Sequence, residues 1–104
     1  MDIEFEKTYL EELYTKGVCR EKKYRFQPQV VRGYQKAIKY LISANRIEDL
    51  YPIKSLNFEA LVGEKKGIFS IRANAQYRVE FVISQGEVPA ITVCNILELT
   101  NHYR

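Results

Sequence analysis

Residues 68–83, IFSIRANAQYRVEFVI, alternate apolar and polar side chains in two runs. A period of two is typical of β-strands, because successive side chains of a strand point to opposite faces of its sheet. Residues 74–76 separate the runs and predict a short hairpin loop. Residues 84–87 predict a second turn, and residues 90–99 a third strand that is apolar on both faces, as in the interior of a sheet.

The N-terminal half has the period of helices instead. Residues 2–5 alternate and predict a short opening strand, whereas residues 7–16 place apolar side chains at helical spacing before Gly17. Pro28 is typical of a first helical turn. The residues after it predict one amphipathic helix over 28–44, with Arg32, Lys36 and Lys39 together on its polar face.

These elements predict the fold class. Helices at the N-terminal end and strands at the C-terminal end are typical of an α+β domain, with the helices packed on one face of an antiparallel sheet. The chain has 104 residues without an internal repeat or a linker rich in Gly, Ser or Pro. We therefore expect a single domain over residues 1–104.

The sequence carries no sign of a membrane or a secretory pathway. Its apolar runs are only a few residues long, and the acidic start lacks the apolar segment of a signal peptide. Cys19 and Cys94 lie far apart and without metal-binding spacing. We expect a cytoplasmic protein with reduced thiols, which pack as small apolar side chains.

Charge is unevenly distributed along the chain. Residues 1–15 hold five acidic and one basic side chain, residues 16–46 one acidic and nine basic, and the remainder seven acidic and six basic. The segment sums are thus −4, +8 and −1, which give the net charge of +3. A block at +8 favours an anionic partner, either nucleic acid or an acidic protein. A solvated helix face remains the alternative.

Several kinds of site are excluded by residue type. One histidine and two distant cysteines cannot form a His/Cys zinc site. The chain also lacks an acidic calcium loop, a glycine-rich phosphate loop and a Gly-x-Ser-x-Gly elbow. We expect a protein that needs no metal and no cofactor.

The polar face of the predicted sheet is the candidate for chemistry. It carries Arg72, Arg78 and Glu80, which we expect to be exposed. Cleavage of RNA without a metal needs a base for the 2′-hydroxyl, a cation for the charge on phosphorus and an acid for the leaving oxygen. Histidine suits proton transfer and arginine suits the phosphorane, which makes His102 and Arg78 candidates. The alternatives are a surface histidine and an arginine paired with Glu59 or Glu80.

Four segments, EALVGEKKG (59–67), IFSIR (68–72), NAQYRVEF (74–81) and NHY (101–103), resemble the HigB/RelE toxin superfamily, and its HigB or plasmid-maintenance killer branch in particular. The resemblance covers residues 50–104, and residues 1–47 share only the strand–helix–helix layout. The matching positions are Leu61, Gly63, Glu64, Lys65, Gly67, Phe69, Ile71, Tyr77, Arg78, Val79, Phe81 and His102.

The resemblance implies a function and its residues. Similar proteins are ribosome-dependent endoribonucleases that cut messenger RNA in the ribosomal A site and are held inactive by a cognate antitoxin. By position, Arg78 would hold the scissile phosphate, His102 would transfer a proton and Tyr103 would stack on a base. We expect Arg72 to contact RNA as well.

This sequence departs from the family pattern at three places. Val62 stands where a lysine is common, so the phosphate contact would fall to Lys54, Lys65 or Lys66. Glu59 stands where a histidine is common and is a candidate base. An acidic residue is common near the terminal histidine, where this chain has Thr100 and Asn101.

The resemblance also gives the basic block a use. The basic block would dock on ribosomal RNA, or it would bind an acidic segment of a HigA-like antitoxin, which is a small DNA-binding protein. The residues of this docking surface are Lys22, Lys23, Arg25, Arg32, Lys36 and Lys39.

The resulting hypothesis is the toxin of a type II toxin–antitoxin pair that cuts messenger RNA during translation. One alternative is a catalytically degenerate RelE-like module that binds RNA or protein, which Val62 and the missing acid near His102 favour. The other is a small housekeeping domain with some different acidic partner.

Overall fold

A computed structural model describes residues 1–86 and 91–101 of the chain. Its main elements, in chain order, are β1 (Asp2–Phe5), α1 (Thr8–Lys16), α2 (Pro28–Ser43), β2 (Glu59–Ala60), β3 (Phe69–Arg72), β4 (Arg78–Gln85) and β5 (Thr92–Thr100). Short 3₁₀ turns, η1 to η4, cover Lys22–Tyr24, Ile47–Leu50, Lys54–Leu56 and Gly63–Lys65. The predicted helices and the three predicted C-terminal strands are confirmed, with boundaries that shift by a few residues.

The described strands form one sheet in the order β1-β5-β4-β3-β2. The three predicted strands, β3 to β5, pair antiparallel as expected, and β2, which was not predicted, adds a further antiparallel edge. In contrast, β1 pairs parallel with β5, with Ile3 opposite Cys94. The sheet is therefore mixed rather than purely antiparallel. A parallel neighbour needs a long crossover. Here the whole chain between β1 and β5 provides it.

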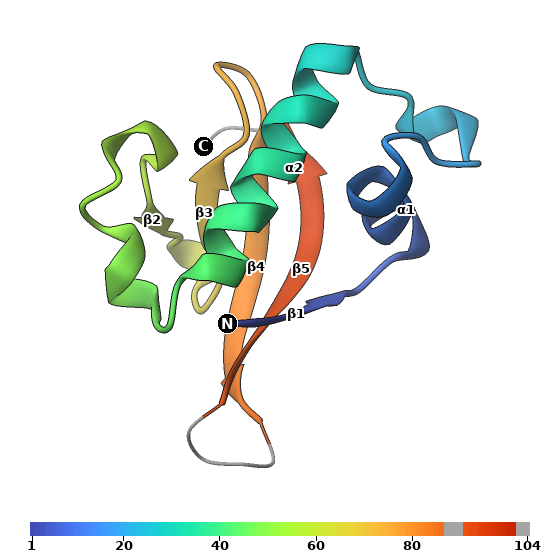
Figure 1. Cartoon of the computed structure of the whole chain (residues 1–104). Helices are drawn as coiled ribbons and strands as arrows, with labels where there is room; N and C mark the ends of the chain where they lie inside the picture. The colour runs from blue at the N-terminus through green and yellow to red at the C-terminus, as the bar shows by residue number, and fades with distance from the viewer. Residues whose placement is uncertain (87–90, 102–104) are drawn as a thin grey trace.

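Both helices cover the same face of this sheet (Figure 1). The apolar side of α2 places Tyr34, Ile38 and Leu41 against Ile71 and Phe81, and all five are fully buried. The opposite side of α2 leaves its three basic side chains exposed, as the sequence predicts. Burial of large apolar side chains on this face is the main stabilisation of the fold.

One close approach sets the position of α2 on the sheet. A Cβ atom added to Gly33 would lie 2.0 Å from the carbonyl oxygen of Ala73. Only a glycine lets the helix backbone come so near to the β3–β4 hairpin. The hairpin loop itself is held by Asn74, whose Oδ1 accepts hydrogen bonds from the backbone N–H groups of Gln76 at 2.9 Å and Tyr77 at 2.8 Å.

The cysteines behave as predicted. Cys94 is fully buried, Cys19 is partly buried, and both are free thiols. Burial raises the pKa of Cys94 to about 12, so its thiol stays protonated and packs as a small apolar group. Among the described residues, no helix is both long and apolar enough to cross a membrane.

Residues 53–67, which precede β3, do not show the alternation of apolar and polar side chains seen in the strands. They form η3, the two-residue strand β2 and η4, and this covering segment lies beside β3. The backbone N–H of Leu61 donates to the carbonyl of Ile68 at 2.9 Å, which ties the segment to the start of β3. At its bend, Asn57 adopts a left-handed conformation with φ of 45°, which asparagine tolerates better than most residues.

Candidate active site

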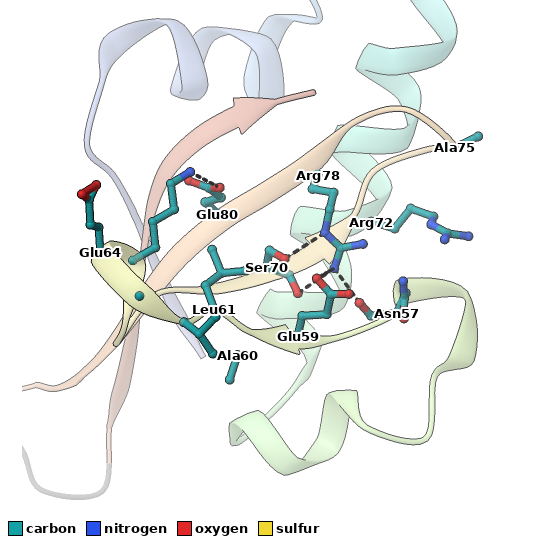
Figure 2. Close-up of a pocket in the computed structure, with 13 residues that line it drawn as sticks. Asn57, Glu59, Ala60, Leu61, Glu64, Ser70, Arg72, Ala75, Arg78 and Glu80 are labelled. Atoms are coloured by element: carbon teal, nitrogen blue, oxygen red, sulfur yellow. Dashed lines mark hydrogen bonds and ion pairs between the residues drawn. The ribbon is translucent and has the colours of Figure 1, made fainter. Parts of the chain in front are cut away.

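The face of the sheet that the helices leave uncovered contains a cavity of about 850 Å³. Its floor comes from β3 and β4 and its wall from the covering segment (Figure 2). The lining residues are Asn57, Glu59, Ala60, Leu61, Val62, Gly63, Glu64, Lys65, Ser70, Arg72, Ala75, Arg78 and Glu80. Four candidates from the sequence, Glu59, Lys65, Arg72 and Arg78, are thus brought together.

Arg78 lies on the floor of this cavity in a fixed orientation. Its Nε donates to Ser70 Oγ at 2.8 Å, and Nη2 donates to the carbonyl oxygens of Asn57 at 2.6 Å and Ser70 at 3.2 Å. These bonds hold the planar guanidinium before any ligand arrives. The sequence placed Arg78 on the correct face, but the prediction that it is exposed is wrong. Only 7% of the residue is accessible, because the covering segment folds over that face.

Glu59 is the partner of Arg78 at the cavity wall. It lies opposite Ser70 in the β2–β3 register, and its Oε1 lies 3.7 Å from Arg78 Nη2. About half of the Glu59 side chain, 51%, is exposed. The half-exposed Glu59 and the fixed guanidinium thus place a proton acceptor and a cation within reach of one bound phosphate.

A second ion pair lies in the same cavity. Lys65 Nζ is 2.9 Å from Glu80 Oε2, and the Glu80 side chain is only 9% exposed. The predicted exposure of Glu80 is therefore wrong for the same reason as for Arg78. The sequence did indicate that Glu80 belongs to this site, because the period of two places it on the same face of the strand as Arg78, two residues later. The cavity lining now holds three basic and three acidic side chains, with a formal sum of zero.

Other predicted contacts lie elsewhere. Lys66 is exposed and does not line the cavity, and Lys54 lines a smaller neighbouring hollow. All six residues of the predicted docking surface are exposed, three of them around η1 and three on α2. Val62 is 83% exposed at the cavity wall, where it adds no charge.

His102 and Tyr103 lie outside the described residues. The last residue of β5, Thr100, pairs with Arg78 in the β4–β5 register. His102 follows it by two positions in the sequence. Across the part of the chain that is described, no three His, Cys, Asp or Glu side chains gather in the way a metal site requires.

Two helices on one face of a five-stranded mixed sheet are the architecture of a RelE-like toxin fold. A solved structure, a YoeB/ParE toxin from Agrobacterium tumefaciens, superposes with a TM-score of 0.57 at 16% sequence identity, over 99% of this chain and 100% of that chain. At this identity the likeness shows the fold alone.

The sequence adds the family. Residues 3–93 match the family described as the RelE-like toxin of the type II toxin–antitoxin system HigB, so the chain belongs to the HigB-like toxins. A toxin of this type is paired with a cognate antitoxin. The match includes the N-terminal half, which resembles the family only in its layout of elements, and it ends before His102. No curated protein matches the sequence.

Proposed function

We propose that this toxin is an endoribonuclease that cuts messenger RNA on the translating ribosome. The observation that carries the proposal is the guanidinium of Arg78, which three hydrogen bonds fix on the cavity floor within 3.7 Å of a half-exposed carboxylate. A fixed planar cation is suited to a phosphate whose negative charge increases during reaction, because no reorganisation is needed at that moment.

The proposed reaction uses the nucleophile that RNA itself carries. The 2′-oxygen attacks the adjacent phosphorus, and Glu59 accepts the proton of that hydroxyl. Arg78 stabilises the charge on the phosphorane oxygens. The bond to the 5′-oxygen then breaks, and that oxygen takes a proton from His102. The products are a 2′,3′-cyclic phosphate and a free 5′-hydroxyl. Tyr103 stacks on a base of the strand.

The charge balance supports dependence on the ribosome. The cavity lining sums to zero, so it offers little net attraction to free RNA. The strongest positive charge lies instead in residues 16–46, whose docking surface is exposed. We infer that this surface binds ribosomal RNA and brings the cavity to the message, with Lys65 and Arg72 at the cavity for neighbouring phosphates. The same surface would attract an acidic segment of a HigA-like antitoxin.

The test is a reconstituted translation reaction with a defined message, in which primer extension locates the cuts. Arg78→Lys keeps the charge but loses the planar fork, and we expect cleavage to fall by about 100- to 1000-fold. His102→Ala should also lose cleavage, whereas Lys66→Ala, a change at an exposed lysine outside the cavity, should cut as the wild type does. Thermal melting of each variant separates loss of chemistry from loss of folding.

Two results would contradict the proposal. A message that stays intact at high concentration of wild-type toxin would favour the catalytically degenerate binding module. Ribosome binding that is unchanged after reversal of the charges of Arg32, Lys36 and Lys39 would contradict the docking role of this surface.

A further inference from the structure

A second hollow of about 360 Å³ adjoins the cavity of the candidate active site. Its lining residues are Tyr51, Ile53, Lys54, Asn57 and Phe58, and Asn57 lines both spaces. A strand that threads the cavity can therefore place its next nucleotide in this hollow.

An aromatic wall bounds this hollow. Tyr51 is 56% exposed, and the centroid of its ring lies 5.1 Å from the ring centroid of Phe58. Phe58 in turn stacks on Phe69 at 5.6 Å, which connects the wall to β3. An exposed ring held by partly buried aromatics is a platform on which a flat ligand stacks with little loss of side-chain freedom.

Asn57 connects the hollow to the catalytic arginine. Its backbone is left-handed, with φ of 45°, and its carbonyl accepts the 2.6 Å hydrogen bond from Arg78. The residue itself is exposed, and its amide side chain carries two donors and an acceptor. The backbone carbonyl of Asn57 can thus orient Arg78 while its side-chain amide contacts a ligand.

We propose that this hollow is a nucleobase subsite for the nucleotide adjacent to the scissile phosphate. The inference rests on the proposed function and deepens it. Tyr51 stacks on the base, the amide of Asn57 hydrogen-bonds to the base edge, and Lys54 neutralises the phosphate of that nucleotide. Aromatic surface, one amide and one cation beside a phosphate-binding cavity match a nucleotide better than an apolar peptide, which would leave the amide and the lysine without a use.

The experiment measures kcat/KM for ribosome-dependent cleavage of messages that differ only in the nucleotide next to the cut. We expect Tyr51→Ala to lose about 10- to 100-fold, and Tyr51→Phe to keep nearly full activity because the ring remains. Asn57→Gly tolerates the positive φ and keeps the carbonyl that Arg78 needs. This variant should therefore cut, but with a reduced preference among the four nucleotides.

An abasic nucleotide at the same position makes the test specific. The wild type should lose about as much activity on the abasic message as Tyr51→Ala loses on the normal one, and Tyr51→Ala should lose little more when the base is absent. Additive losses, or a Tyr51→Ala variant that is folded by melting and cuts at the wild-type rate, would overturn the subsite while leaving the proposed function intact. A wild-type toxin that cuts no message would overturn both.

Discussion

The two faces of the sheet are buried by different means. On the face below the helices, Ile71, Val79 and Phe81 are fully buried and contact other apolar side chains. On the other face, Ser70, Arg78 and Glu80 are buried almost as deeply, at 1%, 7% and 7% exposure, but each has a polar partner. The same strands thus carry a core on one side and a fixed polar site on the other. Substitutions that disturb packing should therefore destabilise the helix face. Substitutions that remove a hydrogen-bond or ion-pair partner should destabilise the polar face.

The largest expected effect is on the helix face. In Gly33→Ala the new Cβ would collide with the carbonyl oxygen of Ala73, 2.0 Å away, and backbone cannot yield as a flexible side chain would. Alanine gains about 1 kcal/mol in helix propensity, but we expect a net loss of about 3 kcal/mol in the free energy of unfolding. Urea unfolding measures it.

Gly86→Ala is the matched control for this change. Its added Cβ would meet nothing closer than 3.4 Å, and its φ is not in the left-handed region. We expect less than about 1 kcal/mol in either direction. Equal losses at the two positions would show that contact with the hairpin does not position α2, and the contrast between the faces would lose its strongest support.

A smaller effect is expected on the polar face. Ser70→Ala removes the acceptor of the 2.8 Å hydrogen bond from Arg78 Nε while leaving the fold of β3 unchanged. A buried charged donor without that acceptor should lower the free energy of unfolding by about 2 kcal/mol. Cleavage should fall as well, because the guanidinium is less firmly held. Urea unfolding and the translation reaction give the two values.

Ser84→Ala supplies the comparison, since Ser84 is an exposed serine on β4. It should change the free energy of unfolding by less than about 0.5 kcal/mol. If Ser70→Ala proved equally silent in both stability and cleavage, the orientation of Arg78 would not depend on this bond. Its contacts with the carbonyl oxygens of Asn57 and Ser70 and with Glu59 would then be sufficient.

The sequence predicted the helix face well and the polar face only in part. Period and spacing identify Ile71, Val79 and the apolar side of α2, since each strand or helix encodes its own pattern. They also place Arg78 and Glu80 on one face. Burial of that face depends on residues 53–67, whose turns carry no period, so the exposure of both side chains was predicted wrongly. Contacts between segments distant in sequence, such as Lys65 with Glu80 or Asn57 with Arg78, have no local signal.

The parallel pairing of β1 was missed for a related reason. Residues 2–5 predict a strand, but a strand pattern does not state its partner or direction. The catalytic roles are a separate matter. Arg78 is a candidate from its residue type and sheet face, Glu59 comes from the resemblance, and both line the cavity. The roles of Arg78, Glu59, His102 and Tyr103 all stay predictions.

The smallest expected effect sharpens the comparison within the polar face itself. Glu80→Gln keeps the shape of the side chain and an oxygen that can accept from Lys65 Nζ, but it removes the charge of the 2.9 Å ion pair. Because the Lys65 side chain is 37% exposed, water compensates much of that loss, and we expect a cost of about 1 kcal/mol or less, decreasing with added salt. The formal charge of the cavity lining also rises from zero to +1, which should strengthen its binding of RNA at low salt. Urea unfolding at two salt concentrations and RNA binding by fluorescence anisotropy measure both effects. A loss above about 3 kcal/mol would instead show that this ion pair contributes as much to stability as the packing of the helix face. That result is expected for an ion pair that water does not reach.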